Sequence, residues 1–208
     1  MKMRVTIRDA QRPTESWGVR RQTRTRDRVL SAAGKILRRQ GYSQLTMERV
    51  AAESGVAKTT LYRRWPTKAA LCMDLYLDIS GRELNMPDTG DVSGDLRHIF
   101  KTVVHLQTRT VAGPAFLGLI AEALVNPDTR KAFLAEFAER RREVTRAVLK
   151  RAIQRRQIRP DTDIDLFIDA LGGAVTFRLL QGHAPLTTSF ANALITLLLA
   201  GCSTKEAR

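Results

Sequence analysis

The sequence has only two cysteines, Cys72 and Cys202, and they lie far apart in 208 residues. So few thiols do not make a disulfide framework, and we expect both to be reduced in a cytoplasmic protein. No apolar run approaches the about 18 residues that a membrane-spanning helix requires. The first residues carry cations but no apolar stretch follows them, so the sequence predicts no secretory signal and no membrane partner.

Motifs that mark common enzymes are also missing. The sequence contains no HExxH, no GxSxG, no CxxC pair and no glycine-rich phosphate loop after a strand. His98 and His105 lie seven residues apart, and two histidines alone are weak evidence for a metal. We therefore predict no enzyme activity, no catalytic residues, no metal and no cofactor.

Negative charge is scarce in the first third of the chain. Residues 1–68 hold 17 Lys and Arg against 5 Asp and Glu, a net charge of +12, whereas residues 69–208 supply only +2 of the total of +14. Because the excess is local, it indicates a nucleic-acid partner rather than a generally sticky surface. Residues 1–24 are predicted to form a flexible basic arm. The arm either follows DNA or is a disordered terminus without a role.

The most informative stretch, GVAKTTLYRRWPTK, covers residues 55–68. Gly55 supplies a tight turn after a short helix, because glycine enters the left-handed region freely. A second helix follows, and Pro66 ends it. Leu61 and Trp65 face inward, so hydroxyls, a phenol and cations face outward, the groups that contact phosphates and bases. This layout of helix, glycine turn and helix predicts a helix-turn-helix.

The residues around this stretch resemble the N-terminal DNA-binding domain of the TetR/AcrR family of regulators. The resemblance covers about residues 24–72, where glycines, apolar positions, tyrosine and lysine fall in register. A departure is Trp65-Pro66, where the family more often has phenylalanine and a polar residue. The pairs and runs that carry the resemblance are Gly41-Tyr42, Leu45-Thr46, Val50-Ala51, Gly55-Val56, Thr60 to Trp65 and Lys68 to Leu71.

The resemblance implies that the outward residues of the second helix approach bases or phosphates, and that Lys68 binds a phosphate. We accordingly predict a double-stranded DNA operator as the partner. The predicted DNA-binding residues are Thr46, Lys58, Thr59, Thr60, Tyr62, Arg63, Arg64 and Lys68.

Strand-like alternation is absent, and apolar residues recur at helical spacing throughout the chain. The sequence therefore predicts an all-α fold. A three-helix DNA-binding domain (residues 25–70) is joined by a connecting helix to a larger helical effector-binding and dimerisation domain (residues 71–208). The connecting helix is expected to begin near Thr67, which would cap it.

Two helices near the end of the chain, 163–182 and 185–200, are apolar on more than one face. A helix that is apolar all round must be buried all round, and Gly172 with Gly173 would allow another backbone to approach. We predict a homodimer through a four-helix bundle, as in the family, with an internal core of one chain as the alternative. The predicted interface residues are Phe167, Leu171, Gly173, Phe177, Phe190, Leu194, Leu197 and Leu198.

The middle of the chain either encloses a small-molecule cavity or forms an ordinary packed core. Glu122 and Arg141 fall among apolar residues, so if they point inward they need a partner, either each other or a ligand. The predicted ligand-binding residues are Met73, Leu77, His105, Phe116, Leu119, Ile120, Ala123, Phe133, Phe137 and Arg141.

These observations predict a sequence-specific transcriptional regulator. By family analogy it is a repressor that an unidentified small-molecule effector releases from a palindromic operator. The alternative is an architectural DNA-binding protein without an effector.

Overall fold

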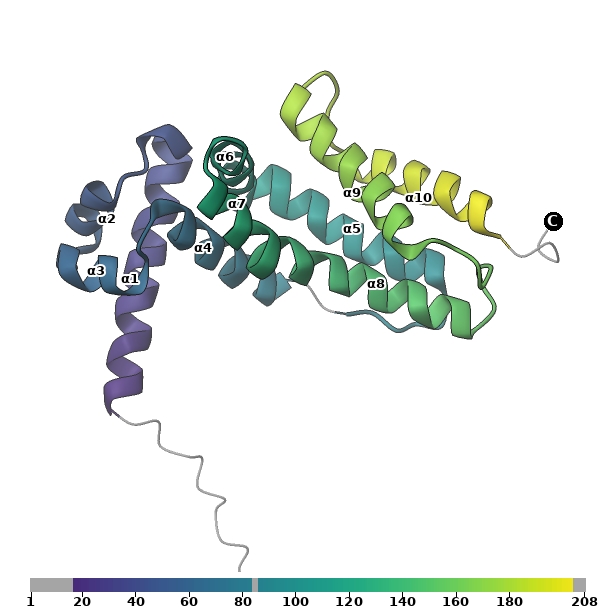
Figure 1. Ribbon diagram of the computed structural model, residues 1–208, viewed down its shortest axis with the longest axis horizontal. Coiled ribbons are helices and arrows are strands. Elements are labelled where there is room, and N and C mark those ends of the chain that lie inside the picture. Colours follow the sequence, from purple (N-terminus) through teal and green to yellow (C-terminus); the bar gives the residue numbers. More distant parts are fainter. Residues whose placement is uncertain (1–16, 84–85, 204–208) are drawn as a thin grey trace, which may run out of the picture.

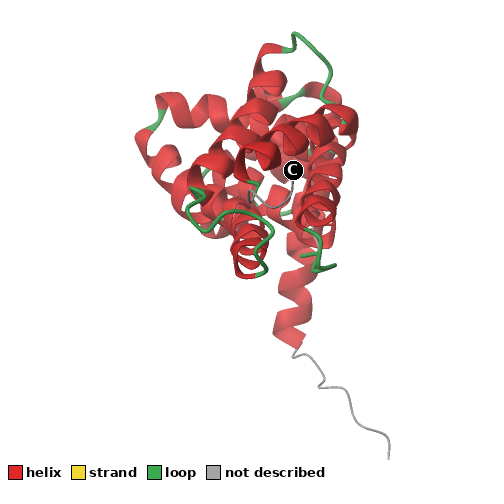
Figure 2. Ribbon diagram, turned by 90° about the vertical axis from the view of Figure 1, so that its right-hand side faces the viewer, coloured by secondary structure: helices red, strands yellow, loops and turns green. Residues whose placement is uncertain are grey.

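The computed structural model describes residues 17–83 and 86–203, and every regular element in these ranges is helical. The predicted all-α fold is therefore confirmed. Figure 1 shows the helix-turn-helix at one end of an elongated molecule and the last two helices toward the other. Figure 2, turned by 90°, shows the helices around the C-terminal end, with no sheet among the described residues.

The DNA-binding end consists of α1 (Trp17–Gln40), α2 (Met47–Ser54) and α3 (Lys58–Arg64). Helix α1 begins at Trp17, so the last part of the predicted flexible arm, residues 17–24, is helical. The segment lacks an apolar stripe but holds three arginines and a glutamine, residues with high helix propensity. Residues 1–16 of the predicted arm lie outside the described part of the chain.

Local signals in the sequence account for the turns between these helices. The Thr46 hydroxyl accepts a hydrogen bond from the Arg49 amide and caps α2. Gly55 follows α2 with φ 64°, in the left-handed region that favours glycine. Leu61 and Trp65 are buried, 0% and 3% exposed. The predicted helix-turn-helix is thus present with its expected inward face.

Helix α4 (Lys68–Glu83) connects the two halves of the molecule. The Thr67 hydroxyl accepts a hydrogen bond from the Ala70 amide at 3.0 Å, as a capping residue does. The indole of Trp65 donates to Asp74 at 3.0 Å, and Arg26 pairs with Asp74 at 2.7 Å. These contacts attach the end of α3 and the middle of α1 to α4.

The larger half surrounds α5 and is built from helices that pack on both sides of it (Figure 1). A π-helical segment, Phe133–Ala138, joins α7 and α8 without a break. The helices are α5 (Val92–Arg109), α6 (Ala112–Val125), α7 (Pro127–Ala132), α8 (Glu139–Gln154), α9 (Ile164–Gln181) and α10 (Thr188–Cys202).

Two apolar cores hold the molecule together. The first runs from the helix-turn-helix through α4 into α6 and includes Leu61, Leu71 and Phe116. The second joins α5, α8, α9 and α10 and includes Leu149 and Leu171. Because the first core is continuous across α4, the DNA-binding helices and α6 form one packed unit.

No single helix in the ranges 17–83 and 86–203 is both long enough and apolar enough to span a membrane. Helices α5 and α6 meet that test only as a pair, bent by 84° at their junction.

Candidate DNA-binding surface and ligand pocket

Helix α3 lies at the outer edge of the DNA-binding end (Figure 1). Lys58, Thr59, Arg63 and Arg64 are exposed there, and Thr60 is half-buried. The guanidinium of Arg64 lies over the indole of Trp65, with Cζ 5.1 Å from the ring centroid. A stacked guanidinium keeps its N–H edge available for hydrogen bonds. Trp65 therefore orients Arg64, and the N–H groups of Arg64 can still bind DNA.

Two other predicted DNA-binding side chains have partners within the protein. The Tyr62 hydroxyl donates a hydrogen bond to Glu48 Oε1 at 3.0 Å, which raises the pKa of the phenol. The Thr46 hydroxyl caps α2. Both side chains are exposed, and these contacts fix α2 against the turn before it and against α3.

Lys68, the predicted phosphate-binding residue, begins α4 next to the ring of Tyr42. Its Nζ lies 4.6 Å from the centroid of that ring and 3.7 Å from Glu122 Oε2 on α6. The Tyr42 hydroxyl donates to the same oxygen at 2.7 Å. Burial, followed by this hydrogen bond, raises the pKa of Tyr42 well above its usual range. Glu122 therefore pairs with the DNA-binding end and with Thr129, not with Arg141.

The absence of a side chain at Gly118 allows the ring of Tyr42 to pack directly against α6. A Cβ atom at position 118 would lie 2.0 Å from the Tyr42 ring. Only glycine leaves this space on α6, one turn before Glu122. The ring of Tyr42 thus lies directly against the α6 backbone, and this contact joins the two halves of the protein.

A cavity of about 470 Å³ lies between the two apolar cores, within the size range of ligand sites. Of the predicted residues, Phe116, Ile120, Phe133 and Arg141 line it. The remaining walls come from α4, α5, α8 and α9. The other lining residues are Tyr76, Ile99, Phe100, Val103, Ala138, Arg142, Val144, Thr145, Ile168, Asp169, Gly172, Gly173, Val175 and Thr176.

Several predicted ligand-binding residues do not line this cavity. His105 is exposed on α5, because its position falls outside the buried stripe of that helix. Met73, Leu119 and Ala123 are buried in packed contacts, Phe137 lies behind the lining within the aromatic cluster, and Leu77 packs at the edge of the first core. The prediction was therefore wrong for these six residues, and residues of α8 and α9 line the cavity in their place.

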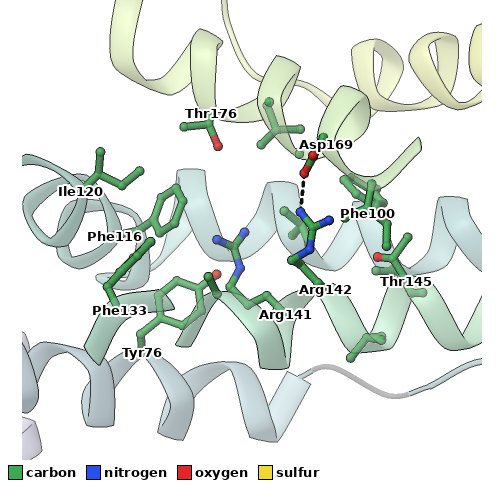
Figure 3. A pocket seen from close by; sticks show the side chains of 18 residues that line it. Tyr76, Phe100, Phe116, Ile120, Phe133, Arg141, Arg142, Thr145, Asp169 and Thr176 are labelled. Atoms are coloured by element: carbon green, nitrogen blue, oxygen red, sulfur yellow. Dashed lines mark hydrogen bonds and ion pairs between the residues drawn. The ribbon is translucent and has the colours of Figure 1, made fainter. Parts of the chain in front are cut away.

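Arg141 is the lining residue of α8 that contacts the aromatic wall of the cavity. Figure 3 shows its guanidinium between the aromatic rings and Arg142, with Thr176 on the facing wall. Its Cζ lies 4.4 Å from the centroid of Phe116 and 5.5 Å from that of Tyr76. Arg142 donates to Asp169, and this pair forms another part of the wall.

Helices α9 and α10 expose large apolar side chains on one outer face. Leu166, Phe177 and Leu180 are 64%, 57% and 52% exposed, and Leu197 is 70% exposed. Phe167 and Leu171, which were predicted at the dimer interface, are instead buried in the chain's own second core. They lie on the opposite face of α9, because the helix is apolar on both faces.

The remaining predicted interface positions divide in the same way. Gly173 is exposed, while Phe190, Leu194 and Leu198 are partly buried against the second core.

The described residues contain no group of three or more His, Cys, Asp and Glu side chains that could hold a metal ion.

A basic, outward-facing second helix on a helix-turn-helix, joined to a helical domain with a cavity, defines a DNA-binding transcriptional regulator with a ligand-binding domain. Comparisons with known proteins place it more narrowly. Residues 29–74 match the family described as "Bacterial regulatory proteins, tetR family", and residues 86–198 match "Tetracyclin repressor-like, C-terminal domain".

Similar proteins include the HTH-type transcriptional regulator AqdR of Rhodococcus erythropolis, 31% identical, with 87% of this chain and 86% of AqdR covered. The DNA-binding transcriptional repressor TetR of Mycobacteroides abscessus is 32% identical, with 80% and 87% covered. The crystal structure of the TetR family regulator SCO0332 superposes with a TM-score of 0.74 and 41% identity, covering 86% of this chain and 99% of SCO0332. The chain belongs to the TetR family of transcriptional regulators, which are not enzymes.

Proposed function

We propose that this regulator is a repressor that binds a palindromic operator as a homodimer and leaves it when a small molecule fills the pocket. The observation that carries this proposal is the contact of Tyr42 and Lys68 with Glu122. Helix α6 supplies Glu122 to the DNA-binding end, and it also supplies Phe116 and Ile120 to the pocket. A ligand that moves α6 must therefore also move its contacts with the turn before α2 and with the start of α4.

The direction of the response follows from linkage. A ligand shifts the protein only by its difference in affinity between two arrangements. Release from DNA therefore requires the effector to bind more tightly to a second arrangement, in which the two α3 helices of the dimer no longer fit the operator, than to the DNA-binding arrangement. A shift of α6 changes the position of Lys68 at the start of α4, and with it the spacing of the two reading helices in a dimer.

The dimer is proposed from the outer face of α9 and α10. Two copies of this face would bury the exposed Leu166, Phe177 and Leu197, and two α3 helices would then meet successive major grooves. Large apolar side chains exposed on two neighbouring helices are typical of an interaction surface. A transcriptional regulator acts where its DNA operator is, so we also propose a cytoplasmic location.

An architectural DNA-binding protein without an effector is the alternative function. It requires no cavity and no sequence preference. The cavity and the relatives named as regulators favour the repressor.

The test begins with an operator selected from random DNA and a compound found by thermal shift. We expect the operator to be symmetric and the compound to weaken operator binding by the wild type. Thr176→Trp, which fills the pocket, should bind the operator normally but no longer respond. Leu134→Trp, at an exposed position outside the pocket, should respond as the wild type does. An asymmetric or absent motif, or a bound compound that leaves operator affinity unchanged, contradicts the proposal.

A further inference from the structure

We infer that the ligand of this pocket is an apolar organic acid whose carboxylate pairs with Arg141. The inference rests on the proposed function only in treating the pocket as the effector site. The charges, ring contacts and volume of the pocket itself determine the chemistry of the ligand.

The first step is the charge balance of the lining. Its cations are Arg141 and Arg142, and its only carboxylate among the described residues is Asp169. Arg142 donates to Asp169 and also to Asp165, the latter at 2.9 Å. Arg146 also donates a hydrogen bond to Asp165, at 2.8 Å. Arg141 therefore has no carboxylate partner in the described part of the chain, and the pocket carries an uncompensated positive charge.

The second step is the orientation of Arg141. Its guanidinium lies over Phe116 at 4.4 Å and near Tyr76 and Phe137 at 5.5 and 5.7 Å. Ring contacts use the face of a guanidinium and leave its N–H edge free. Figure 3 shows this group among the lining side chains, between the aromatic rings and Arg142. The rings thus hold a hydrogen-bond donor ready for a planar acceptor, and a carboxylate fits such a fork.

Other classes of ligand match the charge and the hydrogen-bond donors of Arg141 less well. An aromatic cluster of this kind attracts quaternary ammonium groups, but here Arg141 already occupies it. A cationic ligand would meet a like charge. A neutral hydrocarbon would displace water and leave the N–H groups of Arg141 without an acceptor, which costs free energy. An anion offsets the charge and accepts those hydrogen bonds.

The rest of the ligand follows from the other walls. Apart from the groups already named, the polar side chains of the lining are Thr145 and Thr176. The remaining surface is aliphatic and aromatic, from Ile99, Phe100 and Val103 on α5 to Ile168 and Val175 on α9. A single acidic group on an apolar body therefore matches the pocket, whereas a polyanion or a sugar would bury unpaired polar atoms.

The experiment compares head groups on matched skeletons, using the full chain and isothermal titration calorimetry. One series is naphthylacetate, naphthylethanol and naphthylmethyl-trimethylammonium, and the other is octanoate, octanol and octyltrimethylammonium. We expect the carboxylate in at least one series to bind about tenfold or more tightly than the alcohol, as a hydrogen bond between charged groups predicts. The ammonium compounds should bind most weakly.

Arg141→Met replaces the guanidinium with an unbranched, uncharged side chain, and should remove the preference for the carboxylate while retaining binding of the alcohol. Arg140→Met, an exposed neighbour on α8, is the matched control and should keep the preference. Failure of every carboxylate to bind, equal or tighter binding of the alcohol, or an unchanged preference in Arg141→Met overturns the inference.

Operator binding is measured separately, so the two proposals fail differently. Arg141-dependent binding of the acid without loss of operator binding supports this inference and contradicts the proposed function. If only a neutral compound releases the operator, the proposed function is supported and the inference of an acidic ligand is contradicted.

Discussion

The hydroxyl of Tyr42 donates a 2.7 Å hydrogen bond to Glu122, a residue 80 positions further along the chain. Tyr42 lies in the 3₁₀ turn between α1 and α2, and Glu122 lies in α6. The same carboxylate faces Lys68 at 3.7 Å. One side chain of the ligand-binding half thus contacts both the turn before α2 and the start of α4.

The first prediction concerns the space that Gly118 provides. Gly118→Ala would drive a methyl group into the Tyr42 ring, and overpacking of this kind lowers the free energy of unfolding by about 1–3 kcal/mol. Gly81→Ala is the matched control in α4, where a Cβ meets nothing within 4 Å. It should stabilise the protein by about 0.5–1 kcal/mol, because alanine favours helix over glycine. Urea unfolding of the two variants measures both values, and equal effects would mean that Tyr42 does not pack as described.

The second prediction concerns the charge of Glu122. Glu122→Gln removes the carboxylate beside Lys68 and should strengthen DNA binding by about two- to fivefold, the range of a partly exposed ion pair. The gain should disappear in a Lys68→Ala background. Asp128→Asn removes an equal charge from an exposed site on α7 and should have a smaller effect. Fluorescence anisotropy at fixed salt makes the comparison, and a gain that survives in the Lys68→Ala background would show that Glu122 acts through another group.

The third prediction concerns the apolar face of α9 and α10. Leu197 is 70% exposed in the single chain, so Leu197→Glu should cost the fold little. In a dimer it would bury an unpaired charge. Sedimentation should therefore show a dimeric wild type and a folded monomeric variant. Leu134→Glu, also at an exposed leucine (56%) but on the π-helical segment, should stay dimeric. A monomeric wild type at micromolar concentration would refute this interface.

The fourth prediction concerns the two thiols. Burial raises the pKa of Cys72 to about 12, whereas Cys202 is only half-buried. The thiolate is the reactive form, so iodoacetamide at about pH 8 should label Cys202 first in the native protein. Both should react after unfolding. Mass spectrometry of tryptic peptides measures the two rates, and prompt native labelling of Cys72 would show that the first core opens readily around α4.

The helix-turn-helix was predictable because its signals are local. Gly55 and the spacing of Leu61 and Trp65 act within a few residues of one another, and each appears as expected. The capping of α2 by Thr46 was not predicted. The start of α1 was not predictable from the apolar stripe, because its first turns are helical without being part of that stripe.

The pocket was only partly predictable, since it depends on how distant helices pack. Phe116, Phe133 and Arg141 were found from their positions among apolar residues. The wall from α9 was missed, because an all-round apolar helix does not say which face meets a cavity, a core or another chain. Glu122 was recognised as needing a partner, but its pairing with Tyr42 depends on the approach that Gly118 allows.

The central claim is that α3 reads the operator sequence while Lys68 only binds phosphate. Selection from random DNA at fixed salt, with wild type, Arg64→Ala and Lys68→Ala, tests it most directly. We predict a symmetric motif for the wild type and an unchanged motif for Lys68→Ala, with a log–log salt slope that is shallower by about 0.9 for each phosphate that the variant no longer neutralises. Arg64→Ala should lose about 1–3 kcal/mol per half-site and relax one position of the motif. A wild type that recovers no symmetric motif, or an Arg64→Ala variant that keeps every position, would contradict the account.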